Sequence, residues 1–275
     1  MTQTILSLTT VPPRFPVVHE NLRTLLKQNA KIDAINLYIP RKYRRFEYEA
    51  KDLPKLPKGI SLRIIDEDLG PATKILPAVR EYKGQDVVII FCDDDKVYDN
   101  NWAQRLIDAS VQKPGCCICE EGSLINTPYY SGDTWASAYS PKPNYRKKDL
   151  AYRLRRAVSF GMWKPSKTIS SGYVDMLEGW GGVLVRPDFF DDIDYNIPDI
   201  LWTVDDVWLS GCLERKGIPI WLNADDKVRS KGNSDEVAKA ALRNFVYKGH
   251  DRGSANRACI DYYRDTYGIW GGTKR

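Results

Sequence analysis

The sequence has no apolar run long enough to cross a membrane. A membrane-spanning helix needs roughly 18 or more consecutive apolar residues, and polar or charged residues interrupt every hydrophobic stretch before that length. The N-terminus lacks a basic segment followed by an apolar one, so we expect no signal peptide. Internal repeats and low-complexity tracts are also missing. These features predict a globular protein with at most peripheral membrane contact.

Histidine is scarce, with two residues, and the six cysteines are scattered. Cys116, Cys117 and Cys119 lie close together, but no second cluster and no nearby histidine completes the four ligands of a zinc site. Because the cysteines lie mostly in apolar runs, we interpret them as buried free thiols. Free thiols are typical of a reducing cytosol, so we expect a cytoplasmic protein.

A strong excess of one charge is absent as well. The formal net charge is +5, which suits an anionic ligand such as a nucleotide sugar and is too small to indicate nucleic acid by itself. We therefore expect no nucleic-acid partner.

At 275 residues with 43% hydrophobic content, the chain can form one large domain or two closely fused halves.

The most informative stretch present is an apolar run that ends in three carboxylates. Residues 87–92 are apolar without a break, and Asp93, Asp94 and Asp95 follow directly. Such a run is typical of a strand buried on both faces, and open α/β sheets bind ligands past the carboxyl ends of their strands. Adjacent carboxylates favour Mg²⁺ or Mn²⁺, which also bind phosphate oxygens. The alternative is an acidic turn that only solvates a loop.

Strand and helix patterns alternate along the first half of the chain. This order predicts an α/β fold with a mostly parallel central sheet, right-handed crossovers and flanking helices. We expect strands at residues 4–8, 34–39, 61–65, 87–92 and 116–119, and helices at 19–28, 72–82 (kinked near Pro77) and 102–111. Further along, we expect strands at 183–185 and 219–222 and helices at 150–158, 203–216, 237–246 and 257–267.

Polar residues after the first and third strands are candidates for binding a nucleotide. Thr9, Thr10 and Arg14 lie in the loop after the first strand, which commonly borders the base and ribose in nucleotide-binding α/β folds. Asp66 follows the third strand and is a candidate for the same ligand. The alternative for the first loop is a proline-stiffened turn in which Arg14 is merely exposed.

Lys74 is a candidate for binding phosphate. A turn at Gly70-Pro71 precedes the helix expected at 72–82, which places Lys74 in the first helical turn. A helix N-terminus together with a lysine is a natural seat for phosphate. A solvated lysine in the first turn is the alternative.

Residues 128–171 combine many aromatic and basic side chains without clear strands. Such a length favours a lid or an acceptor-binding loop, with one helix at 150–158. Interleaved basic and aromatic residues are also compatible with single-stranded nucleic acid or an anionic membrane surface. An ordinary solvent-exposed loop is a further alternative.

A glycine-rich turn follows in the second half. In Glu178-Gly179-Trp180-Gly181-Gly182, glycines allow a ligand to approach the backbone, and the indole of Trp180 offers a face on which a sugar can stack. A plain tight turn is the alternative.

A second acidic pair opens the helix expected at 203–216. Thr203 and Asp206 approximate a capping box, which is a purely structural role. Asp205 adds a carboxylate that the box does not need. Such a pair, far in sequence from the first acidic cluster, is what a metal-assisted transfer to a hydroxyl uses as a general base.

His250 is either an exposed loop histidine or a metal ligand.

Together these segments resemble the GT-A glycosyltransferases. The strand entering Asp93-Asp94-Asp95 looks like their Asp-x-Asp motif, and Asp205-Asp206-Val207-Trp208 at a helix start is similar to a segment of their inverting members. Residues 68–74 resemble the donor-binding helix start of bacterial and viral relatives that act on polysaccharide.

The resemblance implies a single GT-A domain over residues 1–275, with a nucleotide-sugar-binding half at 1–127 and an acceptor-binding and catalytic half at 128–275. It implies a nucleotide-sugar donor, often UDP-linked, a glycan or glycolipid acceptor, and Mn²⁺ or Mg²⁺ bridging the diphosphate to Asp95 and Asp93. It also implies that Asp206, with Asp205 second, is the base, and that His250 is the late metal ligand found in many members.

Two other functions stay open. A sugar nucleotidyltransferase uses a similar sheet and metal-bound carboxylates, but residues 7–15 lack the glycine-rich basic loop expected near its N-terminus. A non-enzymatic module that binds glycan or nucleic acid would use the basic and aromatic residues of the 128–171 segment. The predicted function is an inverting, metal-dependent glycosyltransferase.

Overall fold

The computed structural model describes residues 2–126, 135–160, 162–163, 165–225, 231–232 and 245–272. The helix expected at 237–246 lies almost wholly outside these residues. None of the helices within them is long and apolar enough to cross a membrane.

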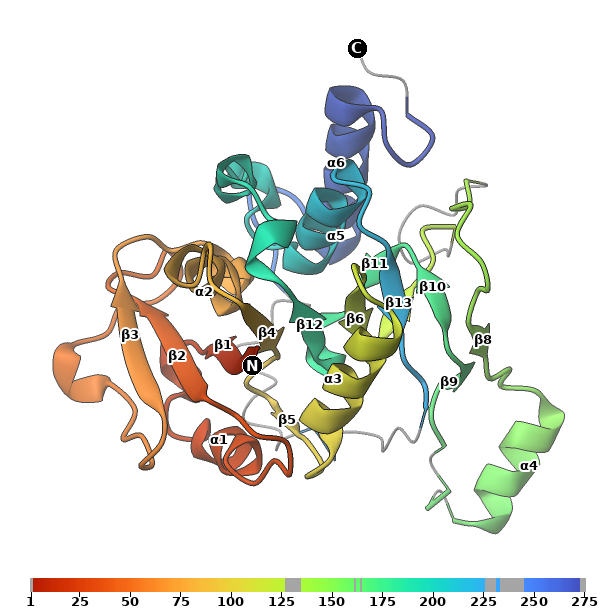
Figure 1. The fold of residues 1–275 in the computed structure, drawn as a ribbon, viewed down its shortest axis with the longest axis horizontal. Helices are drawn as coiled ribbons and strands as arrows, with labels where there is room; N and C mark the ends of the chain where they lie inside the picture. Colours follow the sequence, from red (N-terminus) through yellow and green to blue (C-terminus); the bar gives the residue numbers. More distant parts are fainter. Residues whose placement is uncertain are drawn as a thin grey trace.

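A central sheet of eight strands organises the chain (Figure 1). Across the sheet the order is β10 (Gly172–Val174), β13 (Ile220–Leu222), β6 (Cys117–Cys119), β12 (Val183–Val185), β4 (Val87–Phe91), β1 (Gln3–Thr9), β2 (Ala34–Pro40) and β3 (Ser61–Ile65). Strand β12 runs antiparallel to both of its neighbours and β10 antiparallel to β13, while all other neighbours are parallel. The expected α/β fold with a mostly parallel sheet is therefore confirmed.

Helices cover both faces of the sheet. Neighbouring residues of β4 belong to two separate apolar clusters, Ile89 and Phe91 to one and Ile90 to the other. The first cluster includes residues of α2 (Leu76–Glu81), α5 (Asp205–Arg215) and α6 (Arg252–Tyr267). The second includes residues of α1 (His19–Leu25) and α3 (Trp102–Gln112). The strand before the three aspartates is thus buried on both faces, as its apolar run predicts (Figure 1).

Short elements complete the fold. Three two-stranded sheets pair β5 (Lys96–Val97) with β14 (Lys231–Gly232), β7 (Gly122–Ser123) with β11 (Met176–Leu177), and β8 (Asn144–Tyr145) with β9 (Thr168–Ser170). Helix α4 (Leu150–Val158) lies between β8 and β9 in sequence. The 3₁₀ helices are η1 (Pro12–Arg14), η2 (Ala50–Asp52), η3 (Gly70–Lys74), η4 (Gly179–Gly181), η5 (Pro187–Phe189), η6 (Asp192–Tyr195) and η7 (Asp199–Leu201).

Three local predictions are wrong. The helix expected at 72–82 is two elements, η3 and α2, separated at Ile75, because Pro77 lies in the first turn of α2 and cannot continue an existing helix. The capping box of Thr203 and Asp206 does not form, since the N-cap of α5 is Val204 and no side chain caps it. The 128–171 segment contains strands β8 and β9, although no strand was expected there.

The predicted environment of the cysteines is confirmed. All six lie within the described residues, each is buried, and each is a free thiol.

Strands from both predicted halves join the central sheet. The division of roles at residue 127 stays a prediction.

Candidate active site

The three aspartates after β4 each lie beside a cation. Asp94 turns inward and is 6% exposed, with its Oδ1 2.5 Å from Nη1 of Arg14, and it accepts a hydrogen bond from the Thr10 hydroxyl. Arg14 and Thr10 come from the loop after β1, which is the strand next to β4 in the sheet. Burial raises the pKa of Asp94, while Arg14 opposes that shift. Two of the three donor-site candidates after β1 therefore lie at the acidic turn, paired with Asp94.

Asp95 retains a carboxylate oxygen suited to a cation. Its Oδ1 is buried and accepts no hydrogen bond from the described residues, although Nζ of Lys96 lies 3.1 Å away. Its Oδ2 is 3.6 Å from Nη2 of Arg14. Mg²⁺ is commonly held by one or two carboxylates together with phosphate oxygens of the substrate. A divalent-ion site at Asp95 and Asp93 stays a prediction.

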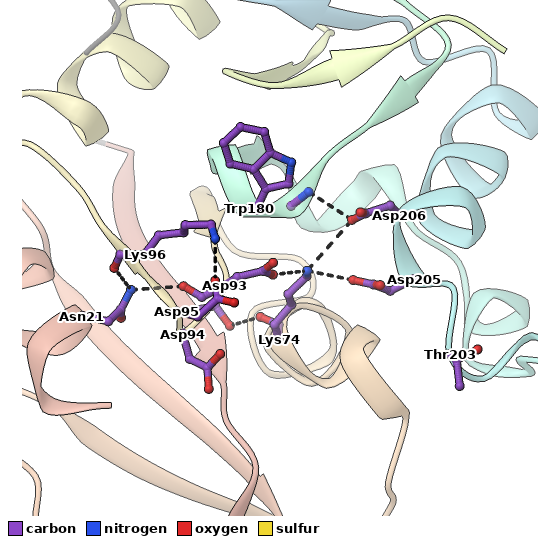
Figure 2. Close-up of polar contacts among 12 residues, drawn as sticks. Asn21, Lys74, Asp93, Asp94, Asp95, Lys96, Trp180, Thr203, Asp205 and Asp206 are labelled. Carbon is purple, nitrogen blue, oxygen red and sulfur yellow. Dashed lines mark hydrogen bonds and ion pairs between the residues drawn. The ribbon is translucent and has the colours of Figure 1, made fainter. Parts of the chain in front are cut away.

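Lys74 connects the two acidic clusters (Figure 2). Its Nζ lies 2.6 Å from Oδ1 of Asp93 and 2.7 Å from Oδ2 of Asp205, and its side chain is 5% exposed. Oδ1 of Asp206 is 4.0 Å from the same ammonium. Burial by itself would lower the pKa of Lys74, but Asp205, Asp93 and Asp206 raise it well above the ordinary value. The lysine is therefore a buried cation among three carboxylates.

The surroundings of Lys74 differ from the helix N-terminus expected there, and phosphate binding by this lysine stays a prediction. The residue ends η3, and α2 begins only at Leu76, so the helix N-terminus that motivated the expectation is not formed at this lysine. Its ammonium is already engaged by two carboxylates. Despite burial, Lys74 holds the pKa of Asp93 below its usual range.

Asp206 combines a fixed orientation with a raised pKa. Its Oδ1 accepts a hydrogen bond of 3.0 Å from the backbone N–H of Gly179, and its Oδ2 lies 3.7 Å from Nη2 of Arg252. Burial and the neighbouring Asp205 raise the pKa of Asp206 to about 7, against the opposing effects of Lys74 and Arg252. A carboxylate that titrates near neutral pH is suited to take and release a proton.

Gly179 packs directly against this network. A Cβ at residue 179 would collide with Nζ of Lys74 and lie 3.2 Å from Oδ1 of Asp206. The glycine thus lets the backbone N–H reach the carboxylate beside the lysine.

The other two glycines of the turn pack against protein. A Cβ on Gly181 would lie 2.7 Å from the side chain of Glu121, and one on Gly182 would overlap the indole of Trp102. Trp102 also donates a hydrogen bond of 2.8 Å from Nε1 to the carbonyl of Gly181. Gly182 has φ +93, which favours glycine. The structure therefore gives these glycines a packing reason, and their role toward a ligand stays a prediction.

The Trp180 ring is held in place by its neighbours. The indole Nε1 donates a hydrogen bond to Oε2 of Glu178 at 2.9 Å. The backbone carbonyl of Trp180 accepts one from the Tyr98 hydroxyl at 3.0 Å. Nζ of Lys96 lies 5.9 Å from the ring centroid. Figure 2 shows the indole near Lys96 and above the acidic turn. A pre-oriented indole is suited to stack on a sugar ring.

Asp66 and Thr9 do not join this network. The side chain of Asp66 is 89% exposed and pairs with Arg41, at the end of the outermost strand β3. The Thr9 hydroxyl donates to the carbonyl of Tyr38 on the neighbouring strand β2. Neither residue contacts the three aspartates through a hydrogen bond or ion pair described for it.

His250 lies in the segment before α6. Its backbone pairs with Tyr247, and its Nδ1 is buried without a hydrogen-bond partner among the described residues. In the part of the chain that the structure describes, no group of three or more His, Cys, Asp or Glu residues is arranged to hold a metal ion. Metal binding by Asp93, Asp95 and His250 together therefore stays a prediction.

Sequence reasoning missed three residues that shape the site. Arg252 approaches Asp206, Lys96 approaches Asp95, and buried Asn21 donates to the carbonyls of Asp93 and Lys96 at 3.1 and 2.8 Å. The adjacency of Lys96 to the aspartates was a usable signal. A polar Asn21 beside the apolar Leu22 of the helix at 19–28 was a weaker signal. No pattern in the sequence around Arg252 indicated that this residue belongs to the site.

Comparisons with known proteins add one structural likeness. No family model matches the sequence, and no curated protein matches it. The crystal structure of S. aureus TarS 1-349 is similar with a TM-score of 0.44 and 13% sequence identity, covering 85% of this chain and 60% of that one. The chain thus spans less than two thirds of that structure.

Proposed function

We propose that the protein is a metal-dependent, inverting glycosyltransferase. It would move a sugar from a nucleotide-sugar donor, of the UDP-linked type, to a hydroxyl of a glycan or glycolipid acceptor. The observation that carries the proposal is the juxtaposition around Lys74. One buried ammonium contacts the acidic turn after β4 through Asp93 and the acidic pair of α5 through Asp205.

Asp206 is the proposed general base. Its pKa of about 7 allows it to be ionised at neutral pH and still accept a proton from an attacking hydroxyl. The Gly179 N–H fixes its Oδ1. Asp205 contributes indirectly, because its charge raises the pKa of Asp206 while it shares Lys74.

The acidic turn is the proposed site for the donor's diphosphate. Asp95 and Asp93 would hold Mn²⁺ or Mg²⁺, which when bound stabilises the negative charge of a departing nucleoside diphosphate. Arg14 and Lys96 place two further cations within 3.6 Å of Asp95. These side chains reduce the repulsion between the turn and an anionic donor.

Lys74 is proposed to act as a positioning residue rather than a phosphate ligand. It holds Asp93 toward the donor side and Asp205 toward the base. An inverting transfer needs the base and the leaving group on opposite faces of the sugar. A lysine between the two carboxylate groups supports that arrangement.

A direct test screens sugar nucleotides with and without Mn²⁺ for thermal stabilisation, and then assays transfer with each one that binds. We expect at least one sugar nucleotide to stabilise the protein only with the metal and to yield a free nucleoside diphosphate. Formation of pyrophosphate from a nucleoside triphosphate and a sugar phosphate would instead identify a nucleotidyltransferase. Failure of every donor with every metal would contradict the enzyme proposal.

A further inference from the structure

Helix α4 stands apart from the rest of the chain with no buried residue. In Figure 1 it lies at the lower right, beyond β8 and β9 and clear of the central sheet. Leu150, Leu154 and Val158 are 81%, 64% and 73% exposed. Soluble proteins rarely leave a row of large aliphatic side chains uncovered, so this exposure needs an explanation.

The exposed aliphatic residues share one face of α4. Their spacing of four residues places Leu150, Leu154 and Val158 along a single stripe. By the same helical geometry, Arg153 and Arg155 lie on opposite edges of that stripe. The helix is therefore amphipathic, with an apolar stripe bordered by arginines on both sides.

Two residues of α4 outside the stripe contact Trp163, which follows the helix in sequence. The ring of Tyr152 packs against Trp163 with centroids 5.4 Å apart, and the guanidinium of Arg155 lies 5.9 Å from the same indole. Asp149 caps the helix by accepting a hydrogen bond from the backbone N–H of Tyr152. These contacts order the helix within its own segment, and the exposure of Leu150, Leu154 and Val158 places the aliphatic stripe in solvent.

The residues just after α4 extend the exposed apolar surface. Phe160 and Met162 are 91% and 79% exposed. Phe160 also adopts φ +49, which is uncommon for a bulky residue and disfavoured sterically. The chain therefore keeps a large aromatic side chain in solvent at a strained backbone position.

The charge around this surface is strongly positive. Between residues 142 and 170, Asp149 is the single acidic residue, and the basic residues are Lys142, Arg146, Lys147, Lys148, Arg153, Arg155, Arg156, Lys164 and Lys167. Arginines and lysines beside an exposed apolar stripe are the features of helices that lie in the interface of anionic membranes. The charge pattern thus selects a negatively charged partner with an apolar interior.

We propose that α4, with Phe160 and Met162, docks the protein on the surface of a bilayer that contains anionic lipid. The aliphatic stripe enters the boundary between headgroups and acyl chains, and the flanking arginines contact lipid phosphates. A second copy of the chain is a less suitable partner for this surface, because two such basic surfaces repel each other. Single-stranded nucleic acid is poorer too, since it stacks on aromatic rings rather than on leucine and valine.

This inference does not rest on the proposed function, and its test needs no sugar donor. Sedimentation of the 275-residue chain with vesicles of phosphatidylcholine alone, or of phosphatidylcholine with phosphatidylglycerol, measures docking directly. We expect binding to the anionic vesicles only, weakened by added salt. We also expect Leu154→Glu to reduce that binding at least about tenfold.

Val111→Glu is the matched apolar control, because Val111 is 76% exposed on α3. For charge, the double variant R153Q/R155Q is compared with K51Q/K83Q, since Lys51 and Lys83 are exposed elsewhere and the net charge falls equally. We expect only the α4 variants to lose binding, with circular dichroism unchanged.

Three results would overturn the inference. They are an absence of binding to anionic vesicles, equal binding to neutral vesicles, and equal losses in the α4 variants and their controls. Binding of single-stranded RNA that Leu154→Glu weakens, without vesicle binding, would assign the surface to nucleic acid instead.

Discussion

At the scale of single residues, the proposed role of Asp206 as general base makes its ionisation the source of the expected pH dependence. Burial and Asp205 raise its pKa to about 7, and a general base must be ionised to act. We therefore expect kcat/KM for transfer to rise with pH and to reach half of its plateau near pH 7.

Replacing this carboxylate tests its role. Asp206→Asn should lower kcat by about 10²–10⁴-fold, because general-base catalysis contributes that much, while sugar-nucleotide affinity in a calorimetric titration stays unchanged. Transfer at the wild-type rate in this variant would leave Asp206 as a structural residue only.

The same pKa shift predicts an effect on stability. The folded state raises the pKa of Asp206 above the ordinary 3.8, so the protein gains stability from this group at low pH and loses it as pH rises through about 7. Asp206→Asn removes that loss. The asparagine variant should therefore gain more stability over wild type at pH 8 than at pH 5, by about 1–3 kcal/mol in urea unfolding. Asp66→Asn, at an exposed aspartate, is the control and should show no such pH dependence.

Lys74 offers a further prediction at this scale. Lys74→Met leaves the buried carboxylate of Asp205 and the partly exposed carboxylate of Asp93 without their cation, which should destabilise the fold by about 3–5 kcal/mol. Lys83→Met removes an exposed pair with Asp192 and should cost about 0–1 kcal/mol. Adding Asp205→Asn to Lys74→Met should recover part of the loss. Equal denaturation midpoints for the two single lysine variants would contradict this account of Lys74.

At the scale of elements, η4 packs between Asp206, the proposed base, and Lys74 through Gly179. A Cβ at Gly179 meets Nζ of Lys74, which is the end of a side chain rather than backbone. We expect Gly179→Ala to fold and to lose at least about tenfold in kcat, since small displacements at an active site are costly. Its kcat/KM profile should also move to higher pH, because a displaced Lys74 lowers the pKa of Asp206 less. Gly253→Ala, whose Cβ has its nearest neighbour at 3.6 Å, should retain wild-type kinetics.

Local patterns predicted most elements because local physics decides them. The bounds of β3, α4 and β12 are those that the sequence indicates. The capping box at Thr203 did not form because a distant group engages one of its members. The Asp206 carboxylate, which would accept from the backbone N–H of Thr203, accepts from the backbone N–H of Gly179 instead. No local pattern contains this contact.

Sheet order explains which site residues were predictable. The loop after β1 meets the three aspartates because β1 lies directly beside β4. Asp66 follows β3, which lies three strands from β4 and hence roughly 14 Å away in the sheet. The sequence shows that both loops leave the sheet at its carboxyl edge, but it does not give the order of the strands.

At the scale of the whole molecule, the two halves of the chain meet at one ion network. The turn after β4 in the first half supplies Asp93, helix α5 in the second supplies Asp205 and Asp206, and Lys74 lies between them. This arrangement unites a proposed diphosphate site with a proposed base. Helix α4 projects elsewhere, so the surface proposed to dock on lipid is separate from that network (Figure 1).

The central claim is that the turn after β4 binds a nucleoside diphosphate through a divalent ion. Calorimetric titration of UDP and other nucleoside diphosphates, with and without Mn²⁺, tests it most directly when wild type is compared with Asp95→Ala and the exposed control Asp66→Ala. We predict that wild type and Asp66→Ala bind one of these ligands only with the metal, and that Asp95→Ala does not bind it. Equal affinity with and without Mn²⁺, or undiminished binding by Asp95→Ala, would contradict the account.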